Sequence, residues 1–371
     1  MKTAIGFLNL HGNPSLGKLT EGRTFGTVTF LGRYALMDFA LSNFCNSDIN
    51  KTEILVEGYY DSVRSHISNG NIWVTNTKTG FIRPVLNEKE LHSYNNTDIA
   101  NIMENIPADA ISEDYVVVAS PQFLMSIDYR DVLRQHGDTG AGITVVYTKT
   151  KEKDRFQGCD NLTIDKDGFV RRFNKAGDSE DEELCVPVES YVFSKDVFIG
   201  LLRFSREISN TKTTIRKMVE LYANNHMTSV KGYEFKGMVV PILSLNQYVD
   251  ESFKLLANKN RKQLFNPEWP IYTTTHNTPP TRYGDNAVVN NCFVANGSYI
   301  KGTVKNCIIS RDVVIDEGAV VENCILFTNT YIGQRVTLKH TVTDKNVVIN
   351  DVKKLSGDEE DYLLISKGAK I

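Results

Sequence analysis

Side chains that could bind phosphate or Mg²⁺ are scattered through the first half of this chain. Asp98, Glu104 and Asp109 could bind Mg²⁺, which prefers carboxylate oxygen. Lys175 is a cation that could pair with a phosphate. Phosphate binding also requires a loop whose glycines let backbone N–H groups approach the ligand. The loop Leu10–Ser15 holds one glycine, and its proline removes a donor, so the set is incomplete.

Short apolar runs that alternate with helical patterns place these residues on an α/β sheet. Ala4–Leu10 and Tyr115–Ala119 are typical of buried strands, and a helix is predicted over Asp128–His136. This alternation favours a parallel sheet with right-handed crossovers, whose ligands lie beyond the carboxyl ends of its strands. Asn161–Ile164 and Phe169–Phe173 flank a turn that ends in Asp-Gly, which predicts a hairpin just before Lys175.

The last part of the chain contains an internal repeat. The pattern Val-x-Asn-Cys ends at Cys292, Cys307 and Cys324, and Leu338–Thr341 is a degenerate further copy. Aliphatic residues recur every six positions here: Val288, Val294, Ile300, then Ile308, Val314, Val320, Leu326, Ile332 and Leu338. A six-residue period predicts a parallel β-helix in which each of these aliphatic residues points inward. The three cysteines would form one inward column, as packing residues rather than metal ligands or disulfides.

Proline and polar residues between the two patterns mark a connector. We expect an α/β domain over residues 1–258, a connector over 259–286 and a β-helix domain over 287–371.

Composition excludes several classes of function. The 371 residues are 41% hydrophobic and 23% charged, as in an ordinary globular protein, and the net charge of −3 argues against a nucleic-acid partner. No apolar run approaches the roughly 18 residues that span a membrane, and the first residues do not resemble a signal peptide. The six cysteines form no Cys-x-x-Cys pair, so we expect no zinc site and a reducing, cytoplasmic setting.

Two segments carry a family resemblance. Leu31–Asn43 resembles, nearly letter for letter, a signature of glucose-1-phosphate adenylyltransferases (ADP-glucose pyrophosphorylases), and Tyr272–Thr281 resembles the connector of that family. The resemblance covers essentially the whole chain. It implies an α/β fold: a Rossmann-like, GT-A-like nucleotidyltransferase domain with a mixed sheet, followed by a short left-handed parallel β-helix of hexapeptide repeats. The family joins glucose 1-phosphate to the α-phosphate of ATP and releases pyrophosphate, with Mg²⁺ held by carboxylates.

The positions that should do this chemistry hold other residues. Ser15 stands where the family has an arginine in its Gly-Gly-x-Gly-x-Arg loop, and Phe25 stands where it has a lysine. Gln122 and Pro241 stand where it has the two aspartates that bind Mg²⁺. Losing one such electrostatic contact typically costs about 10²–10³ in rate. We therefore expect no catalytic residue and no cofactor in this chain.

Three basic residues remain as binding candidates. Lys175 matches the lysine that binds the sugar phosphate in the family, although it could also be an exposed hairpin lysine. Arg33 is a second substrate-binding candidate, but we expect it to pair with Asp38 or to brace the strand–helix junction. Arg23 matches one basic position of the family's effector site, but other basic positions there are missing, and we expect a solvated side chain. His11 and His340 are expected to be structural.

These features resemble the GlgD-like, regulatory branch of the family. The chain would then be a non-catalytic or weakly catalytic subunit that joins a catalytic homologue, which binds the Mg²⁺, in a heterotetramer of glycogen synthesis. Sugar phosphate or nucleotide are its candidate ligands. The alternatives are a self-sufficient sugar-phosphate nucleotidylyltransferase with a rearranged site, which would use carboxylates such as Asp98, and a nucleotide-sugar sensor. A hexapeptide acyltransferase would need a catalytic histidine and a longer coil.

Overall fold

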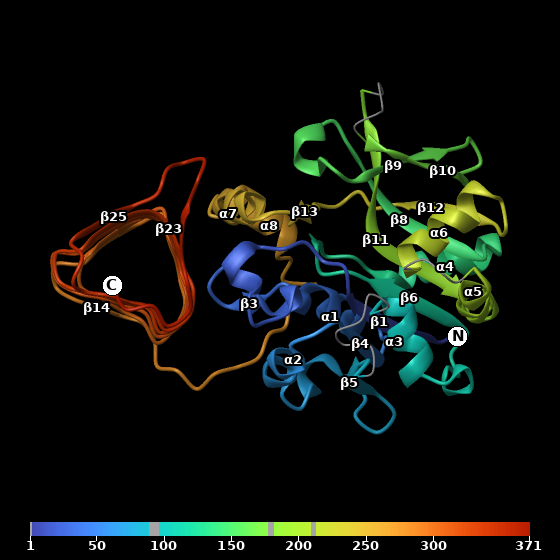
Figure 1. Ribbon diagram of the computed structural model, residues 1–371, viewed down its shortest axis with the longest axis horizontal. Coiled ribbons are helices and arrows are strands. Elements are labelled where there is room, and N and C mark those ends of the chain that lie inside the picture. The colour runs from blue at the N-terminus through green and yellow to red at the C-terminus, as the bar shows by residue number, and fades with distance from the viewer. Residues whose placement is uncertain (1, 89–95, 177–181, 209–212) are drawn as a thin grey trace.

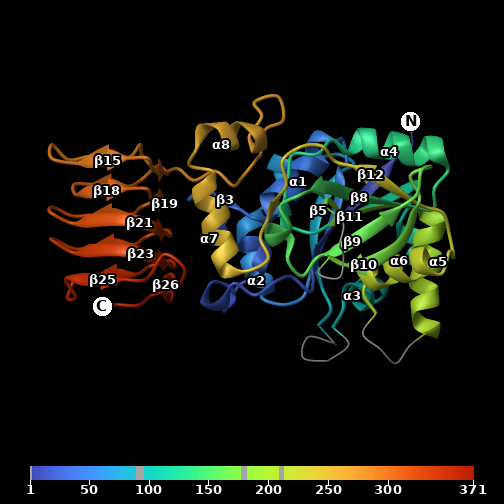
Figure 2. The same ribbon diagram turned by 90° about the horizontal axis from the view of Figure 1, so that it is seen from above.

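Two structural units lie side by side in the computed structural model, which describes residues 2–88, 96–176, 182–208 and 213–371. Figure 1 shows an α/β domain that contains the N-terminus, and beside it a coil that is triangular in cross-section and contains the C-terminus. Figure 2 shows the turns of this coil stacked on one another. The predicted combination of an α/β domain and a parallel β-helix is confirmed.

The α/β domain is built on a seven-stranded mixed sheet. In spatial order the strands are β12 (Val230–Glu234), β8 (Ile143–Thr150), β11 (Leu184–Ser194), β6 (Tyr115–Ala119), β1 (Ala4–Leu10), β4 (Lys51–Val56) and β5 (Phe81–Leu86). β11 runs antiparallel to both β6 and β8, whereas the other neighbours are parallel. β1 and β6 have the bounds that the sequence predicted, because a buried strand is a short apolar run with clear ends.

Helices cover the sheet and lie between the two units. They are α1 (Met37–Asn46), α2 (Tyr60–Ile67), α3 (Asp98–Asn105), α4 (Tyr129–Thr139), α5 (Lys195–Glu207), α6 (Ile215–Asn224), α7 (Leu245–Lys254) and α8 (Asn258–Leu264). α7 and α8 lie on the side that faces the coil (Figure 1). Within the described part of the chain, no helix has the length and apolarity needed to cross a membrane.

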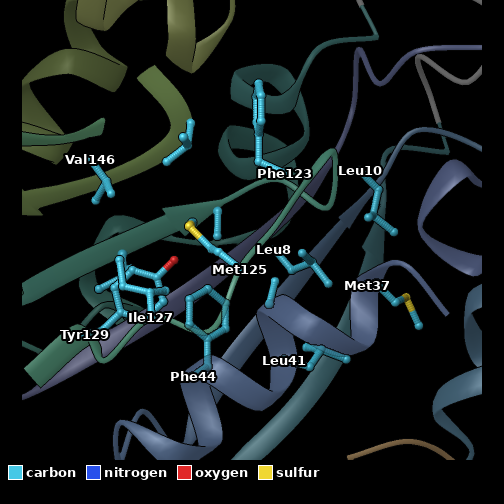
Figure 3. Packing of buried hydrophobic residues seen from close by; sticks show 14 of the residues in the cluster. Leu8, Leu10, Met37, Leu41, Phe44, Phe123, Met125, Ile127, Tyr129 and Val146 are labelled. Atoms are coloured by element: carbon cyan, nitrogen blue, oxygen red, sulfur yellow. The ribbon is translucent and has the colours of Figure 1, made fainter. Parts of the chain in front are cut away.

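One core cluster packs α1 and α4 against the sheet. Figure 3 shows Leu8 of β1 close to Leu41 and Phe44 of α1, with Met125 and Tyr129 beside them. The rings of Phe44 and Tyr129 lie 5.5 Å apart between centroids. The Tyr129 hydroxyl and the Ser190 Oγ on β11 are hydrogen-bonded at 2.9 Å. This buried polar bond ties α4 to the strand that carries the candidate site described below.

Two small ladders flank the sheet at the carboxyl end of β6. β9 (Asp160–Ile164) and β10 (Val170–Lys175) form the predicted antiparallel hairpin. β7 (Phe123–Leu124) pairs antiparallel with β13 (Val240–Pro241). A third pair, β2 (Thr29–Phe30) and β3 (Tyr34–Ala35), precedes α1.

The C-terminal coil consists of short strands that pair in parallel from rung to rung. They are β14 (Arg282–Tyr283), β15 (Val288–Asn290), β16 (Phe293–Val294), β17 (Tyr299–Ile300), β18 (Thr303–Lys305), β19 (Ile308–Ile309), β20 (Val314–Ile315), β21 (Val320–Leu326), β22 (Tyr331–Ile332), β23 (Thr337–Thr343), β24 (Val348–Ile349), β25 (Lys354–Ser356) and β26 (Leu363–Ile365). β14 already pairs with β17, and α8 begins at Asn258, so regular structure overlaps both ends of the predicted connector.

The six-residue period is real, but one part of its predicted frame is wrong. Ile309, Ile315 and Val321 are fully buried in the coil, whereas Val314 and Val320 are partly exposed. Val288 in the first rung was also predicted to point inward, but it is 50% exposed. Each of these short strands has two adjacent aliphatic residues, and their side chains point to opposite faces, so the sequence period alone could not choose between them. Ile308 is also buried, but against the α/β domain rather than inside the coil.

The predicted cysteine column is confirmed. Cys307 and Cys324 are fully buried, Cys292 packs against the same cluster, and all three are free thiols. Thr341 takes the place of cysteine in the degenerate copy, paired in register with Cys324. Its Oγ1 donates to the Lys339 carbonyl, as the Cys324 Sγ donates to the Glu322 carbonyl two residues before it. The column is therefore a packing feature.

A shared apolar cluster holds the two units together. Phe30, Phe39 and Tyr248 of the α/β domain belong to the same cluster as Ile308 and Phe327 of the coil. At Gly32 the φ angle is +71°, and a Cβ atom there would lie 2.7 Å from the carbonyl oxygen of Ile309. Only glycine fits this close approach, so the signature segment contributes directly to the interface.

Burial of His136 on α4 makes stability depend on pH. Its Nδ1 is hydrogen-bonded to the Thr144 Oγ1 at 2.8 Å and its Nε2 to the Ser194 Oγ at 3.0 Å. Desolvation, helped by Lys2, lowers the pKa of His136 from 6.5 to about 4. Between these values the unfolded chain binds a proton that the folded chain does not, so stability falls as the pH falls.

We expect this group to remove about 2 kcal/mol of unfolding free energy between pH 7 and pH 5. His136→Gln, which cannot take up the proton, should weaken the pH dependence by that amount. Urea denaturation at the two pH values would measure it, with the exposed His226→Gln as the matched control. An unchanged pH dependence in His136→Gln would contradict the assignment.

Candidate functional site

A cleft of about 320 Å³ lies beyond the carboxyl ends of β1 and β6, where an α/β sheet of this kind binds its ligands. The loop after β1 contributes Gly12 and Pro14, and the turn after β6 contributes Gln122. β9, β11 and α6 close the other side and carry the charged lining residues: Asp160, Glu189 and Arg216. The cleft is therefore assembled from segments far apart in the sequence.

The two positions that resemblance matches to magnesium aspartates lie next to each other. Pro241 pairs in register with Phe123, and the Ile242 N–H donates to the Gln122 carbonyl at 2.8 Å. Gln122 lines the cleft. The two positions therefore lie at one place in the fold. A neutral amide and a proline offer no carboxylate for a divalent cation.

Side chains of the loop after β1 and of neighbouring segments satisfy the backbone donors of this loop. The His11 N–H donates to the Asn9 Oδ1, and the Gly12 N–H donates to the Glu57 Oε2, both at 3.0 Å. Pro14 has no N–H. The exposed Ser15 accepts the Gly17 N–H through its Oγ at 3.2 Å. The Glu57 carboxylate therefore takes up a backbone N–H group that a bound triphosphate would need.

Phe25, the position that the resemblance matches to the family lysine, is part of the protein core. Its side chain is 5% exposed and packs in the apolar cluster that joins the two units, together with Leu16 and Val28. It cannot neutralise phosphate charge and does not line the cleft.

The described cations at the cleft are paired with its carboxylates. Lys175, on the exposed edge of β10, lies 2.8 Å through its Nζ from the Asp160 Oδ1. The Arg216 Nη2 lies 2.6 Å from the Asp160 Oδ2, and its Nε lies 3.1 Å from the Glu189 Oε1. Two positive and two negative side chains therefore form one network with no net charge. Lys175 does not itself line the cleft, but its charge is compensated by Asp160, which does.

The pKa values of the two carboxylates in this network, Asp160 and Glu189, are shifted by their surroundings. Burial opposes ionisation of Asp160, but the hydrogen bonds from Arg216 and Lys175 outweigh it and lower the pKa of Asp160. Burial raises the pKa of Glu189 despite the attraction of Arg216. Glu189 also accepts a 3.0 Å hydrogen bond from the Tyr191 hydroxyl. These bonds therefore hold the Asp160 and Glu189 carboxylates in place inside the cleft.

Sequence reasoning missed Asp160, Glu189 and Arg216. They lie on a hairpin strand, in the middle of a sheet strand and in the first turn of a helix, and no local motif surrounds them. Asp160, Glu189 and Arg216 form a site only because the fold brings them into contact.

Arg33 does not line the cleft. It is exposed on the loop before α1, beside the coil, where it lowers the pKa of the half-buried Arg311 after the larger effect of desolvation. The expected pair of Arg33 with Asp38 is wrong, because Asp38 accepts the Ala35 N–H at 2.8 Å and bonds to the His66 Nε2 at 2.6 Å. Asp38 does brace the junction before α1, as predicted.

Arg23, the effector candidate, is buried, so the expectation of a solvated side chain is wrong. It is 7% exposed, and its Nη2 donates to both carboxylate oxygens of Asp344 in the coil, at 2.7 and 2.6 Å. The bond joins the two units. Lys345 lies beside it, and desolvation and then Arg23 lower the pKa of that lysine.

The carboxylates considered for a rearranged magnesium site do not assemble into one. Asp98 is buried, accepts the Ile99 and Ile215 N–H groups and the Asn9 Nδ2, and burial raises its pKa to about 6. Glu104 and Asp109 are exposed. Across the described ranges, no three His, Cys, Asp or Glu side chains are grouped so that they could hold a metal ion. The residues of the cleft do not fit Mg²⁺, because its two carboxylates bind Arg216 and Lys175.

Comparison with known families agrees with this architecture. The Nucleotidyl transferase family model matches residues 16–284, and the model described as GlmU-like, C-terminal hexapeptide matches residues 279–362. The chain belongs to the nucleotidyl transferase family. It is 28% identical to "Glycogen biosynthesis protein GlgD" of Bacillus subtilis (strain 168), over 95% of this chain and 92% of the relative.

Two relatives named glucose-1-phosphate adenylyltransferase, from Corynebacterium jeikeium (strain K411) and Clostridioides difficile (strain 630), are 26% and 27% identical, with the same coverage of each chain. The family resemblance read from the sequence is confirmed.

Proposed function

We propose that this chain is a non-catalytic or weakly catalytic regulatory subunit of a bacterial ADP-glucose pyrophosphorylase in glycogen biosynthesis. The observation that carries the proposal is the neutralised cleft, in which Arg216 and Lys175 are paired with Glu189 and Asp160. The similarity to a glycogen biosynthesis protein supports the pathway. The chain would act in the cytoplasm on a catalytic homologue that converts ATP and glucose 1-phosphate to ADP-glucose and diphosphate, and that homologue would bind the Mg²⁺.

The chain would regulate its partner through contacts between subunits, which would shift the conformational equilibrium of the partner. The first rung of the coil is the surface we assign to the partner. Val288 and Tyr283 there are 50% and 55% exposed. β14 and β15 each pair in parallel with a later rung. The opposite end differs, because the Ile371 N–H donates to the Val348 carbonyl and so closes the last turn. A homologue with a matching coil can stack on the open end, giving the proposed heterotetramer.

Charge on this rung should block assembly. We expect Val288→Asp to reduce copurification with the catalytic homologue at least about tenfold, because it places a carboxylate in an apolar contact. Pull-down from cells that express both chains would measure it. Val352→Asp is the matched control, since Val352 is 38% exposed but lies near the closed end. Equal loss of the partner from both variants, or from neither, would contradict the assignment of the surface.

Coexpression with the catalytic homologue tests the function itself. The two chains should copurify, and the complex should differ from the homologue alone in its kinetic constants or in its response to effectors. If the chains do not copurify and the kinetics of the homologue are unchanged, the proposal is wrong.

The persistence of a cleft of about 320 Å³ favours a second candidate function, a sensor that binds a sugar ligand without turnover. The two functions are compatible within one subunit. Equilibrium binding to the purified chain tests the second one.

A further inference from the structure

We propose that the cleft binds an uncharged sugar, and that Glu189 is the residue that excludes the phosphorylated form. The inference rests on the proposed function, because it treats the cleft as a binding site without turnover.

The lining offers donors and acceptors of the kinds that sugar hydroxyls use. Gln122 and Gln157 contribute amides, Asp160 and Glu189 contribute carboxylates, and Arg216 contributes a guanidinium. A hydroxyl both donates and accepts, so it can bond to every one of these groups without displacing an ion pair. Apolar surface from Phe123 and Pro187 lies among them. Such a mixture is typical of small-ligand sites, and the volume is at the lower end of their usual range.

A phosphate would meet a different environment. Arg216 already directs its Nη2 to Asp160 and its Nε to Glu189, and Lys175 also binds Asp160. An incoming dianion would have to compete with two carboxylates that are held in place. Those carboxylates would also repel it at short range, where partial burial weakens solvent screening. The network therefore favours a neutral ligand over its phosphate ester.

The backbone at Glu189 supports a specific role for its side chain. Glu189 lies in β11 where the register with β8 slips between Pro187 and Ser190, and its φ angle is 50°. A glycine would adopt this left-handed conformation at less cost, and the bulge does not itself need a carboxylate. The side chain is nonetheless retained inward, 13% exposed, between Arg216 and Tyr191. The Glu189 carboxylate therefore compensates the positive charge of the Arg216 guanidinium.

Calorimetric titration of the full chain with glucose, maltose, glucose 1-phosphate and ADP-glucose tests the inference. We expect wild type to bind glucose or maltose, with glucose 1-phosphate weaker by at least about tenfold. Maltose separates a site for one hexose from a site for a glucan end. Glu189→Gln keeps the shape of the side chain and removes its charge, and we expect it to strengthen binding of glucose 1-phosphate at least about tenfold.

Glu189→Gly provides a second route to the same result, since it also relieves the left-handed backbone. Glu268→Gln, at an exposed glutamate away from the cleft, is the matched control and should bind as wild type does. Circular dichroism would show that each variant is folded. The inference is overturned if wild type binds neither sugar, if it binds glucose 1-phosphate as tightly as glucose, or if folded Glu189 variants gain no affinity for the phosphate.

These outcomes are separate from those of the coexpression experiment. A chain that modulates its partner but binds no sugar would overturn the ligand and leave the regulatory function standing. A chain that binds glucose but neither copurifies with the homologue nor changes its kinetics would overturn the regulatory function and leave the ligand standing.

Discussion

Purified alone, this chain should release pyrophosphate from ATP and glucose 1-phosphate at least about 10⁴-fold more slowly than a catalytic homologue assayed beside it. The reaction brings an anionic nucleophile to a triphosphate, so it depends on donors and cations placed around the phosphates. Here Phe25 is in the core, and the Gly12 N–H binds Glu57. Gln122 and Pro241, the positions that the resemblance matches to the magnesium aspartates, have no carboxylate to offer a metal ion.

The expected difference of about 10⁴-fold in rate follows from the missing donors, cation and carboxylates taken together. Each lost contact of this kind typically costs about 10²–10³ in rate, and losses within one site are not additive, so about 10⁴ is a conservative lower bound. A coupled assay of pyrophosphate release, with Mg²⁺ present, would measure it. The control is a sample of the same chain carrying Glu189→Gly, which should remain inactive, because opening the cleft restores neither the metal ligands nor the loop donors. Rapid, Mg²⁺-dependent turnover by the wild-type chain would favour the self-sufficient enzyme instead.

The residues of the signature segment, Leu31–Asn43, have structural roles. Gly32 allows the close approach of the coil, and Asp38 braces the start of α1. The Asn43 Nδ2 donates to the Met125 carbonyl, and its Oδ1 accepts from the Ile127 N–H and the Trp269 Nε1. The segment therefore holds the interface and the connector in place. A family resemblance read from these residues predicted the fold correctly and indicated little about activity.

Local patterns predicted the elements because their causes are local. The bounds of β1 and the hairpin of β9 and β10 follow from apolar runs and turn residues that are adjacent in the chain. Gln122 and Pro241 were reached by two separate counts along the family pattern, whereas their adjacency is seen only in the structure. The prediction of which aliphatic residues point into the coil was partly wrong. Val314 and Ile315 are equally apolar, and only the winding of the chain determines which of them is buried.

The candidate site was harder to predict, because it depends on pairings across the fold. Asp160, Glu189 and Arg216 come from three elements, and a charge pattern along the chain does not reveal which ions meet. The same limit explains the error at Arg23. Its partner is 321 positions away in the sequence, so no local pattern indicated that the side chain would be buried.

That distant pair supports the second large prediction, which concerns how the two units are held together. Arg23 and Asp344 are 7% and 1% exposed, and Asp344 also accepts the N–H of Lys345 at 2.7 Å. Removing one partner of a buried ion pair leaves the other charge desolvated and without compensation. We expect Asp344→Asn to lower the unfolding free energy by about 3–5 kcal/mol, because the guanidinium of Arg23 would remain buried beside Lys345.

Chemical denaturation followed by circular dichroism would measure this effect against two comparisons. Asp131→Asn breaks the exposed pair with Arg134, whose side chains are 50% and 70% exposed, and should change stability by at most about 1 kcal/mol. The double variant Arg23→Met with Asp344→Leu removes both charges from the same interface. It should recover most of the lost stability, because the cost in the single variant comes from the charge left behind rather than from the missing attraction. If Asp344→Asn is no less stable than the exposed control, the pair does not hold the two units together, and the apolar cluster around Phe30 and Ile308 does so alone.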